Sequence, residues 1–342
     1  MPPDTPPAHT PEQANAPEKA DALEKAAVGM LLGCAVGDAV GELAFAQRER
    51  ADLIAIAALM PVLRYTDDTA MTAVLAQSLI DHGDVVSDPL GAAFAAAYNA
   101  EPKRGYGPGP PRLFARVAAS GLSYAEAAQE LYDGHGSWGN GAAMRVAPVG
   151  LAYRDDPAAL YAAACTSAAV THAHPVGQDG AAVQARAVAL ATHAHLAGET
   201  LDPAAVAADL QGFARTEVIA DKMACVAALL DAGAEAGTVA DAVGRSVAVE
   251  ESMPFAVYAF LASPEDSLKT LYTAVLNGGD RDTLGAMAGA ISGAYLGPEG
   301  LRKALTKRVE NRETLIGLGQ KLAAAFPAMP PRPGGPDGAG AG

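Results

Sequence analysis

Two short acidic segments, each followed by an apolar run with helical spacing, carry the side chains best suited to chemistry in this sequence. The first is YTDDT at 65–69 and the second is GGDRDT at 278–283. Aspartate and threonine before a helix are ordinary caps, because their side-chain oxygens accept hydrogen bonds from the free N–H groups of the first turn. One cap needs one oxygen, however, and a second nearby carboxylate adds repulsion that capping does not require. The doubled acids therefore suggest a binding site as well as two caps.

The two segments would form a cation site if the fold brings them together. Four carboxylates lying close to one another are strongly destabilised unless cations lie among them. All the donor atoms would be oxygen, since neither segment contains Cys or His, and oxygen-only sites favour Mg²⁺, Mn²⁺ or Ca²⁺ over zinc or copper. Two aspartate pairs suit two metal ions about 3.5–4 Å apart. Because the segments lie more than two hundred residues apart in the chain, this site depends entirely on the fold.

Two glycine-rich segments, RGYGPG at 104–109 and GHGSWGNG at 134–141, lie between helical stretches. They could be simple loops. They could also bring backbone N–H groups close to phosphates or ribose hydroxyls, with Tyr106 or Trp138 available for stacking. Two histidine pairs, His172/His174 and His193/His195, could each be taken for metal ligands. On a helix, residues i and i+2 face different directions, so we interpret His193/His195 as a solvated or packed pair.

The elements that must position these residues are helical almost throughout. Alanine-rich stretches with apolar residues at i, i+3 and i+4 recur, whereas alternating β-type runs are scarce. We predict an all-α fold of roughly a dozen helices, given a typical helix length of ~11 residues. The predicted helix starts are capping residues that precede a proline, namely Asp88-Pro89, Asp156-Pro157, Asp202-Pro203 and Ser263-Pro264. The predicted stops are Gly83, Gly198 and Gly278.

The amino-acid composition excludes several classes of protein. The 342 residues are 50% hydrophobic and 18% charged, and 24 basic against 39 acidic residues give a net charge of −15. Nucleic acid held on a basic surface is therefore not expected. The three cysteines, none in a CxxC pair, argue against a disulfide framework or a zinc ribbon. The sequence does not start like a leader peptide, and its most apolar stretch, residues 26–36, is too short to cross a membrane. We therefore expect a cytoplasmic protein with no membrane partner.

The chain reads as one single compact multi-helix domain with two tails. Residues 1–20 are Pro-rich and predict a disordered N-terminal arm, residues 21–326 form the folded domain, and residues 327–342 form a flexible Pro/Gly tail. We find no repeat of fixed period and no internal linker.

Six segments taken in order resemble the ADP-ribosylglycohydrolase family, whose prototype removes ADP-ribose from dinitrogenase reductase. They are GCAVGDAVG at 33–41, YTDDTAMT at 65–72, RGYGPG at 104–109, GSWGNGAAMRVAPVGLAY at 136–153, THAHPVGQDGA at 171–181 and GGDRDTLGAMAGAISGAYLG at 278–297. The RGYGPG and GSWGNGAAMRVA segments, with ESMPFAVYAF at 251–260, look most like the branch that cleaves serine-linked ADP-ribose and poly(ADP-ribose). The resemblance implies an all-α single domain, in agreement with the helical pattern.

The resemblance also implies a role for each matching residue. The metal ligands fall on Thr66, Asp67, Asp68, Asp280, Asp282 and Thr283, and catalysis is assigned to Asp67, Asp68 and Asp282. The ADP-ribose contacts fall on Gly105, Gly109, Ser137, Trp138, Asn140 and His172, with Tyr132 near the adenine. A binding role for His172 is therefore preferred to metal ligation.

One position departs from the family pattern. The family usually carries a glutamate four residues after GDAxG, on a mobile loop near the metals, and here that count from Gly41 gives Phe45. A phenylalanine can neither bind a metal nor transfer a proton. Either Glu42 or Glu49 substitutes through a shifted loop, or a metal-bound water attacks without that residue, or hydrolysis is impaired.

We therefore expect a metal-dependent hydrolase that cleaves the bond at C1″ of protein-linked, serine-linked ADP-ribose or of poly(ADP-ribose). Two Mg²⁺ ions (or Mn²⁺) would hold the 2″- and 3″-hydroxyls and activate the attacking water. The alternative is a non-catalytic ADP-ribose reader, which the Phe45 substitution favours. A third hypothesis, an immunity protein that acts through its N-terminal arm, is weaker because that arm is poor in apolar residues. The expected partner is ADP-ribose or an ADP-ribosylated protein, bound by a monomer.

Overall fold

The stretches with helical spacing are helices in the computed structural model, which describes residues 16–327 and thereby confirms the all-α prediction. Within that range β-type pairing is limited to two isolated bridges, Leu63 with Val309 and Gly139 with Ala248. The helices number more than the predicted dozen, partly because α6, α7 and α16 are single short turns of four to six residues. They are α1 (Ala16–Ala44), α2 (Arg50–Leu59), α3 (Asp67–His82), α4 (Ser87–Ala100), α5 (Gly109–Ser120), α6 (Tyr124–Gln129), α7 (Ala147–Ala152), α8 (Pro157–Ala169), α9 (Pro175–Ala197), α10 (Pro203–Phe213), α11 (Glu217–Asp231), α12 (Ala236–Val243), α13 (Val249–Leu261), α14 (Ser267–Leu276), α15 (Arg281–Gly300), α16 (Lys303–Thr306) and α17 (Arg312–Ala325).

Half of the predicted helix starts are confirmed. Asp156 and Asp202 cap α8 and α10, each accepting hydrogen bonds from two first-turn N–H groups. The stops at Gly83 and Gly198 are confirmed as left-handed C-caps of α3 and α9. Gly278, with a φ of 90°, follows α14 after the capping residue Asn277.

The other two predicted starts are wrong. Helix α4 already begins at Ser87, and the Asp88 carboxylate instead accepts a hydrogen bond from the Tyr124 N–H at 3.2 Å. Helix α14 is capped by Asp266, whose Oδ1 accepts from two first-turn N–H groups at 3.1 and 3.0 Å. Ser263 and Pro264 belong to the turn before it, because the stronger carboxylate cap lies three residues further on.

The first and last helices lie near the two ends of the described residues. Helix α1 begins at Ala16, so residues 16–20 of the predicted arm are helical, because this stretch continues into the apolar helix without a breaking residue after Pro17. The rest of the arm lies outside the described residues. Of the predicted tail, Pro327 follows α17 without regular structure, and the remainder also lies outside them.

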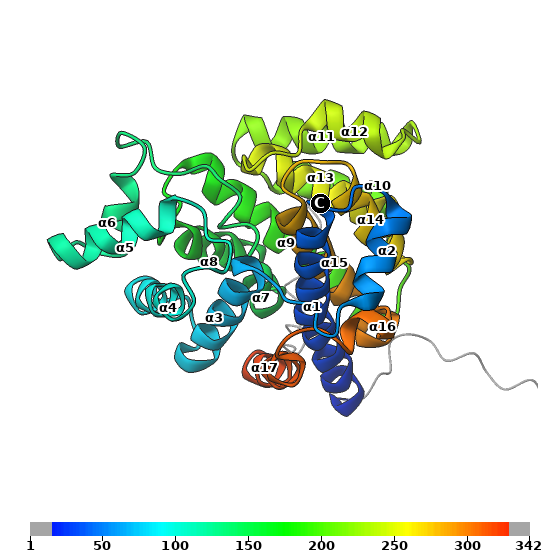
Figure 1. Ribbon diagram of the computed structural model, residues 1–342, viewed down its shortest axis with the longest axis horizontal. Helices are drawn as coiled ribbons and strands as arrows, with labels where there is room; N and C mark the ends of the chain where they lie inside the picture. The colour runs from blue at the N-terminus through cyan, green and yellow to red at the C-terminus, as the bar shows by residue number, and fades with distance from the viewer. Residues whose placement is uncertain (1–15, 328–342) are drawn as a thin grey trace, which may run out of the picture.

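Helices α1 and α15 form the centre of the fold and run antiparallel at very short distance (Figure 1). Glycines recur every fourth residue in both helices, so the backbones touch along one stripe. A Cβ added at Gly29, Gly33, Gly37 or Gly41 would lie 2.2, 2.1, 1.9 or 2.3 Å from the carbonyl oxygens of Gly293, Gly289, Gly285 and Arg281, respectively. Only glycine permits such an approach. The antiparallel contact carries the end of α1 to the beginning of α15.

The remaining helices surround this pair. Helices α3 to α8 lie on one side in Figure 1 (left), α2, α14 and α16 lie on the other, and α17 packs against α1 and α3. Residues 17–44 of α1 are long and apolar enough to cross a membrane by length and composition alone, a longer stretch than the sequence analysis recognised. In this structure 89% of the most apolar window is buried inside the protein, so α1 serves as the core helix of the domain.

Candidate active site

The first acidic segment forms the N-terminus of α3. Thr66 is the N-cap, and its hydroxyl donates to Asp68 Oδ2 at 3.1 Å while accepting from the Asp68 N–H at 3.5 Å. Asp67 and Asp68 occupy the first turn, and both are buried. Asp68 Oδ1 is buried without any hydrogen-bond partner among the described residues. An orphaned carboxylate oxygen is costly, which shows that capping alone does not account for this acid.

The second acidic segment forms the N-terminus of α15. Asp280 is the N-cap residue, and its Oδ2 accepts a hydrogen bond from Asn140 Nδ2 at 2.8 Å rather than from its own helix. Asp282 lies in the first turn and its Oδ1 accepts from the Thr283 N–H at 2.9 Å. Asn140 therefore connects the second glycine-rich segment to this acidic helix end.

The two acidic helix ends, which lie far apart in the sequence, face one cavity of about 340 Å³. Burial raises the pKa of Asp68 well above its ordinary value, and the charges of Asp282 and Asp38 raise it further. The pKa of Asp282 is raised by burial and then by Asp280 and Asp38. The acids of the two helices are thus close enough for their charges to interact, and solvent screens these charges only weakly.

Among the described residues, no group of three or more His, Cys, Asp or Glu side chains is gathered closely enough to form a complete metal site as it stands. The donor set nevertheless fits hard cations. The donor atoms around the acids are carboxylate and threonine oxygens, Asp68 Oδ1 has no partner, and the acids raise one another's pKa. Oxygen ligands of this kind suit Mg²⁺ or Mn²⁺ rather than zinc. Thr66, Asp67, Asp68, Asp280, Asp282 and Thr283 are the residues that could hold them.

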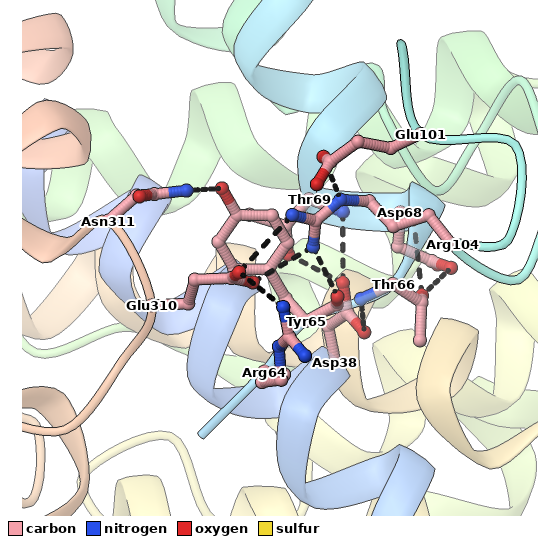
Figure 2. Close-up of polar contacts among 10 residues, drawn as sticks. All are labelled: Asp38, Arg64, Tyr65, Thr66, Asp68, Thr69, Glu101, Arg104, Glu310 and Asn311. Atoms are coloured by element: carbon pink, nitrogen blue, oxygen red, sulfur yellow. Dashed lines mark hydrogen bonds and ion pairs between the residues drawn. The ribbon is translucent and has the colours of Figure 1, made fainter. Parts of the chain in front are cut away.

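A further acid, Asp38 of α1, is fully buried next to the first acidic segment and has no role predicted from the sequence. Its Oδ1 accepts from the Thr66 N–H at 2.8 Å, and its Oδ2 accepts from the Thr69 N–H at 3.0 Å and the Thr69 hydroxyl at 2.6 Å (Figure 2). Asp38 thus caps the first turn of α3 from another helix, which leaves Asp67 and Asp68 free to face the cavity. The signal in the sequence was a single charged residue within a long apolar stretch.

Arg104 fixes the backbone of the first acidic segment (Figure 2). Its Nη1 donates to the Tyr65 carbonyl at 2.8 Å and to Glu310 Oε2 at 2.9 Å, and its Nε donates to Glu101 Oε2 at 2.6 Å. The guanidinium also lies 4.7 Å from the centre of the Tyr65 ring. Arg104 therefore ties the 101–105 loop, the start of α3 and the segment before α17 into one rigid wall of the site.

Most of the predicted ligand contacts line the cavity, among them Gly105, Gly109, Tyr132, Ser137, Asn140 and His172. Gly105 has a φ of 104°, and a Cβ there would lie 3.0 Å from Asp67 Oδ1, so the turn and the close approach both require glycine. A Cβ at Gly109 would lie 3.5 Å from the Tyr132 hydroxyl. The half-exposed Tyr132 ring therefore borders the end of the cavity formed by the 105–109 loop.

Trp138 and Thr66 do not line this cavity. The Trp138 side chain is 43% exposed and its ring lies 5.3 Å from that of His174, so no stacking surface for a ligand in the cavity is formed by it. The backbone of this loop is what reaches the site, and the Asn140 N–H holds it by donating to the Val247 carbonyl at 2.9 Å. Thr66 instead borders an adjoining cavity of about 640 Å³, which Glu42 and Gly105 also line.

His172 is buried and lines the cavity. Burial lowers its pKa to about 3, and the nearby charge of Arg145 adds to this effect, so the imidazole is neutral. Arg145, which the sequence analysis did not single out, is a fully buried cation lining the same cavity. Its signal was again an isolated charge, here within GNGAAMRVAPVG.

The other three histidines of the two pairs make hydrogen bonds to the backbone. His174 caps α9, its Nδ1 accepting from the Val176 N–H at 3.2 Å. His193 Nε2 and His195 Nδ1 bond to the carbonyl oxygens of Arg154 at 3.0 Å and Tyr295 at 2.8 Å, respectively. His193 and His195 are thus each held by a backbone carbonyl oxygen.

The position of the missing glutamate lies just after α1. Phe45 is 45% exposed and lines neither of the two cavities. Glu42, in the last turn of α1, lines the adjoining cavity and is one of the charges that raise the pKa of Asp282. Glu49 is an exposed residue preceding α2. Of the two possible substitutes, Glu42 is the one near the acids.

Comparisons with known proteins agree with this architecture. The sequence profile of the family described as ADP-ribosylglycohydrolase matches residues 19–331. ADP-ribosylhydrolase ARH3 of Homo sapiens is 32% identical over 338 residues, covering 87% of this chain and 93% of its own length. ARH3 of Xenopus tropicalis is 34% identical, covering 77% of this chain and 82% of its own.

A solved structure and a bacterial protein extend the similarity. A chain of a solved structure titled "ADP-ribosylglycohydrolase-related protein complex" is similar with a TM-score of 0.65 at 24% identity, covering 90% of this chain and 99% of that chain, which supports the fold. The uncharacterised protein YegU of Escherichia coli is 29% identical over 83% of this chain and 91% of its own.

Proposed function

Because this chain belongs to the ADP-ribosylglycohydrolase family, we propose that it is an ADP-ribosyl hydrolase that cleaves the bond between C1″ of ADP-ribose and an acceptor side chain. The observation that carries the proposal is the convergence of two acidic helix ends on one cavity lined by both glycine-rich loops. Neither feature alone would suffice, since acids are common caps and glycines are common in loops.

We propose that two divalent cations, Mg²⁺ or Mn²⁺, bind Asp67, Asp68, Asp280 and Asp282 together with the hydroxyls of Thr66 and Thr283. When bound, such ions would supply Lewis-acid chemistry, lowering the pKa of water and holding ribose hydroxyls. The orphaned Asp68 Oδ1 and the pKa values of Asp68 and Asp282, which burial and neighbouring carboxylates raise, support this assignment, because bound cations would neutralise these charges and give the free oxygen a partner.

The residues of the chain itself exclude water, orient the sugar and accept a proton. The cavity excludes part of the solvent from the reacting bond. One of Asp67, Asp68 and Asp282 accepts the proton that the attacking water loses, and the proton is then returned to the acceptor oxygen as its bond to C1″ breaks. The negative charge of these acids stabilises the oxocarbenium-like character that develops at C1″. Asn140 holds Asp280 in place through the 2.8 Å hydrogen bond.

The loops supply the contacts for the rest of the ligand. Gly105 and Gly109 allow backbone N–H groups to approach phosphate or ribose oxygens without side-chain interference. Tyr132 borders the far part of the cavity, where an adenine ring would contact its half-exposed ring. The buried Arg145 provides positive charge inside a protein whose net charge is −15, which helps it accept a diphosphate.

We propose serine-linked ADP-ribose or poly(ADP-ribose) as the substrate class. The support is the RGYGPG and GSWGNGAAMRVA segments, which form the two loops of the cavity, and the similarity to proteins named ADP-ribosylhydrolase ARH3.

The test is a panel of serine-linked, arginine-linked and polymeric ADP-ribose, each incubated with the protein in Mg²⁺ and in EDTA. We expect release of ADP-ribose from the serine-linked or polymeric substrate in Mg²⁺ only. Asp67→Asn is expected to abolish release while the circular dichroism spectrum is kept, whereas Asp81→Asn, an exposed change on the same helix, leaves release unchanged. Binding of every substrate without release would indicate a reader instead, and release by Asp67→Asn at the normal rate would reject the acid-centred mechanism.

A further inference from the structure

A buried chain of hydrogen bonds connects Arg145 to His172 through Thr171. Arg145 Nη2 donates to the Thr171 hydroxyl oxygen at 2.8 Å and to the Ser167 carbonyl at 3.1 Å. The same hydroxyl lies 2.7 Å from His172 Nδ1. All three side chains are buried, so water does not compete for these positions.

The donors and acceptors along this row of hydrogen bonds allow only one placement of the hydrogen atoms. A guanidinium only donates, so the Thr171 oxygen must be the acceptor of the bond from Arg145. The single hydroxyl hydrogen of Thr171 then needs an acceptor, and in the part of the chain that the structure describes His172 Nδ1 is the acceptor it reaches. If Nδ1 accepts, the proton of the neutral imidazole must be on Nε2. The reverse assignment would leave a buried hydroxyl hydrogen unpaired, which is costly.

The Nε2 edge of the ring faces the second glycine-rich loop and the cavity. A Cβ at Gly141 would lie 3.0 Å from Nε2, and a Cβ at Gly139 would lie 3.6 Å from it, so the absence of side chains at both positions leaves this edge open. His172 lines the cavity together with these two glycines and Thr171. No hydrogen bond from a described residue occupies Nε2.

We propose that Thr171, fixed by Arg145, is a positioning residue that holds His172 in the neutral Nε2–H tautomer, so that His172 offers the cavity one hydrogen-bond donor for a ligand oxygen. The identity of that ligand as ADP-ribose rests on the proposed function, whereas the tautomer does not. The nearby acids would repel a negatively charged ligand group. The Nε2–H of His172, fixed beside the buried Arg145, instead donates to an acceptor oxygen of ADP-ribose and so orients the ligand before the reaction.

The tautomer can be measured in the ligand-free protein. Long-range ¹H–¹⁵N correlation spectra of protein labelled in its seven histidines, with the His172 signals identified by their loss in His172→Gln, distinguish Nε2–H from Nδ1–H. We expect Nε2–H at neutral pH in the wild type and in Thr171→Ser, which keeps the hydroxyl, and a mixture of tautomers in Thr171→Val. A wild-type Nδ1–H tautomer, or an unchanged tautomer in Thr171→Val, would overturn the proposal.

Calorimetric titration with ADP-ribose in Mg²⁺ tests the consequence for binding. Thr171→Val is expected to weaken binding about 2- to 10-fold, the equivalent of one hydrogen bond, and Thr171→Ser is expected to restore it. Thr166→Val, an exposed change near the end of α8, the helix that precedes Thr171, serves as the control and binds like the wild type. Equal affinity of Thr171→Val and Thr166→Val would reject the positioning role. If the wild type does not bind ADP-ribose, the proposed function fails while the spectra still decide the tautomer.

Discussion

Gly37 of α1 and Gly285 of α15 lie in backbone contact, such that a Cβ on either residue would come within 1.9 or 2.2 Å of the other's carbonyl oxygen. On each of the two helices, a residue of the site lies close in sequence to this contact. Asp38 follows Gly37 and caps α3, and Asp282 precedes Gly285 by one turn. The stripe of paired glycines therefore sets the distance between the acidic ends of α3 and α15.

The first prediction concerns the stability that this stripe provides. Gly37→Ala forces two packed helices apart and is expected to lower the free energy of unfolding by about 3 kcal/mol, at the upper end of the usual cost of overpacking. Chemical denaturation measures the change. Gly317→Ala, within α17 and with no atom within 4 Å of the added Cβ, is the matched control and should be neutral or stabilising by up to about 1 kcal/mol. Equal stability of the two variants would show that the helices do not need glycine at their contact.

The second prediction is stabilisation by divalent cations. Ions that bind only the folded acids raise the free energy of unfolding by about 2.7 kcal/mol at a concentration one hundred times their Kd. Thermal unfolding in EDTA and in excess Mg²⁺ or Mn²⁺ should therefore show a clear upward shift of Tm at pH 8. Asp282→Asn should lose the shift and Asp81→Asn should keep it. An identical shift in Asp282→Asn would place the bound ion elsewhere.

The third prediction is a pH dependence of the cation-free protein. Burial raises the pKa of Asp67 to about 7 and that of Asp282 to about 8, from an ordinary value of 3.8. The folded state thus binds more protons than the unfolded chain between about pH 4 and 8, so these acids make stability fall as pH rises through that window. In EDTA, Asp282→Asn is expected to gain stability relative to the wild type, more at pH 8 than at pH 5.5. Excess Mg²⁺ should stabilise the wild type less at pH 5.5, because protons compete for the ligands. A difference between variant and wild type that is constant with pH would contradict the raised pKa.

The fourth prediction separates the chemistry of the site from backbone strain. Gly105→Ala places a methyl group 3.0 Å from Asp67 Oδ1 in a left-handed turn, so ADP-ribose release is expected to fall at least about tenfold, a loss of about 1.4 kcal/mol or more in transition-state stabilisation. Gly121, the C-cap of α5, also has a positive φ, 72°, but Gly121→Ala meets open space around the added Cβ. Both variants should lose about 1 kcal/mol of stability from the turn, and only Gly105→Ala should lose activity. Initial rates and unfolding curves of the two variants test this prediction, and an equal loss of activity in both would contradict it.

Much of the fold could be predicted from the sequence, because capping acids, glycine loops and helical spacing are local signals. The same signals selected residues most of which line one cavity. The convergence of the acids could not be predicted, since it depends on the contact between α1 and α15. Its signal was the spacing of four between glycines at 29–41 and 285–297, which becomes meaningful only when the two helices are known to be partners. Asp38 and Arg145 were missed for a related reason, because an isolated buried charge reveals its partner only in three dimensions. Trp138 was assigned to the site as an aromatic ring, whereas the loop directs its backbone inward and its ring outward.

The fifth prediction addresses Phe45, the position where the family glutamate is missing. Glu42 lies one turn earlier in α1, borders the cavity next to Thr66 and acts electrostatically on Asp282. Glu49 borders neither cavity. If Glu42 substitutes for the missing acid, Glu42→Gln should lower kcat for ADP-ribose release by about 10²-fold, the lower end of the range for a general acid or base. Glu49→Gln should leave kcat unchanged, and both variants should keep the wild-type Tm. Full activity of Glu42→Gln would show that the four aspartates suffice without a glutamate, and Phe45→Glu would then be expected to change the rate little as well.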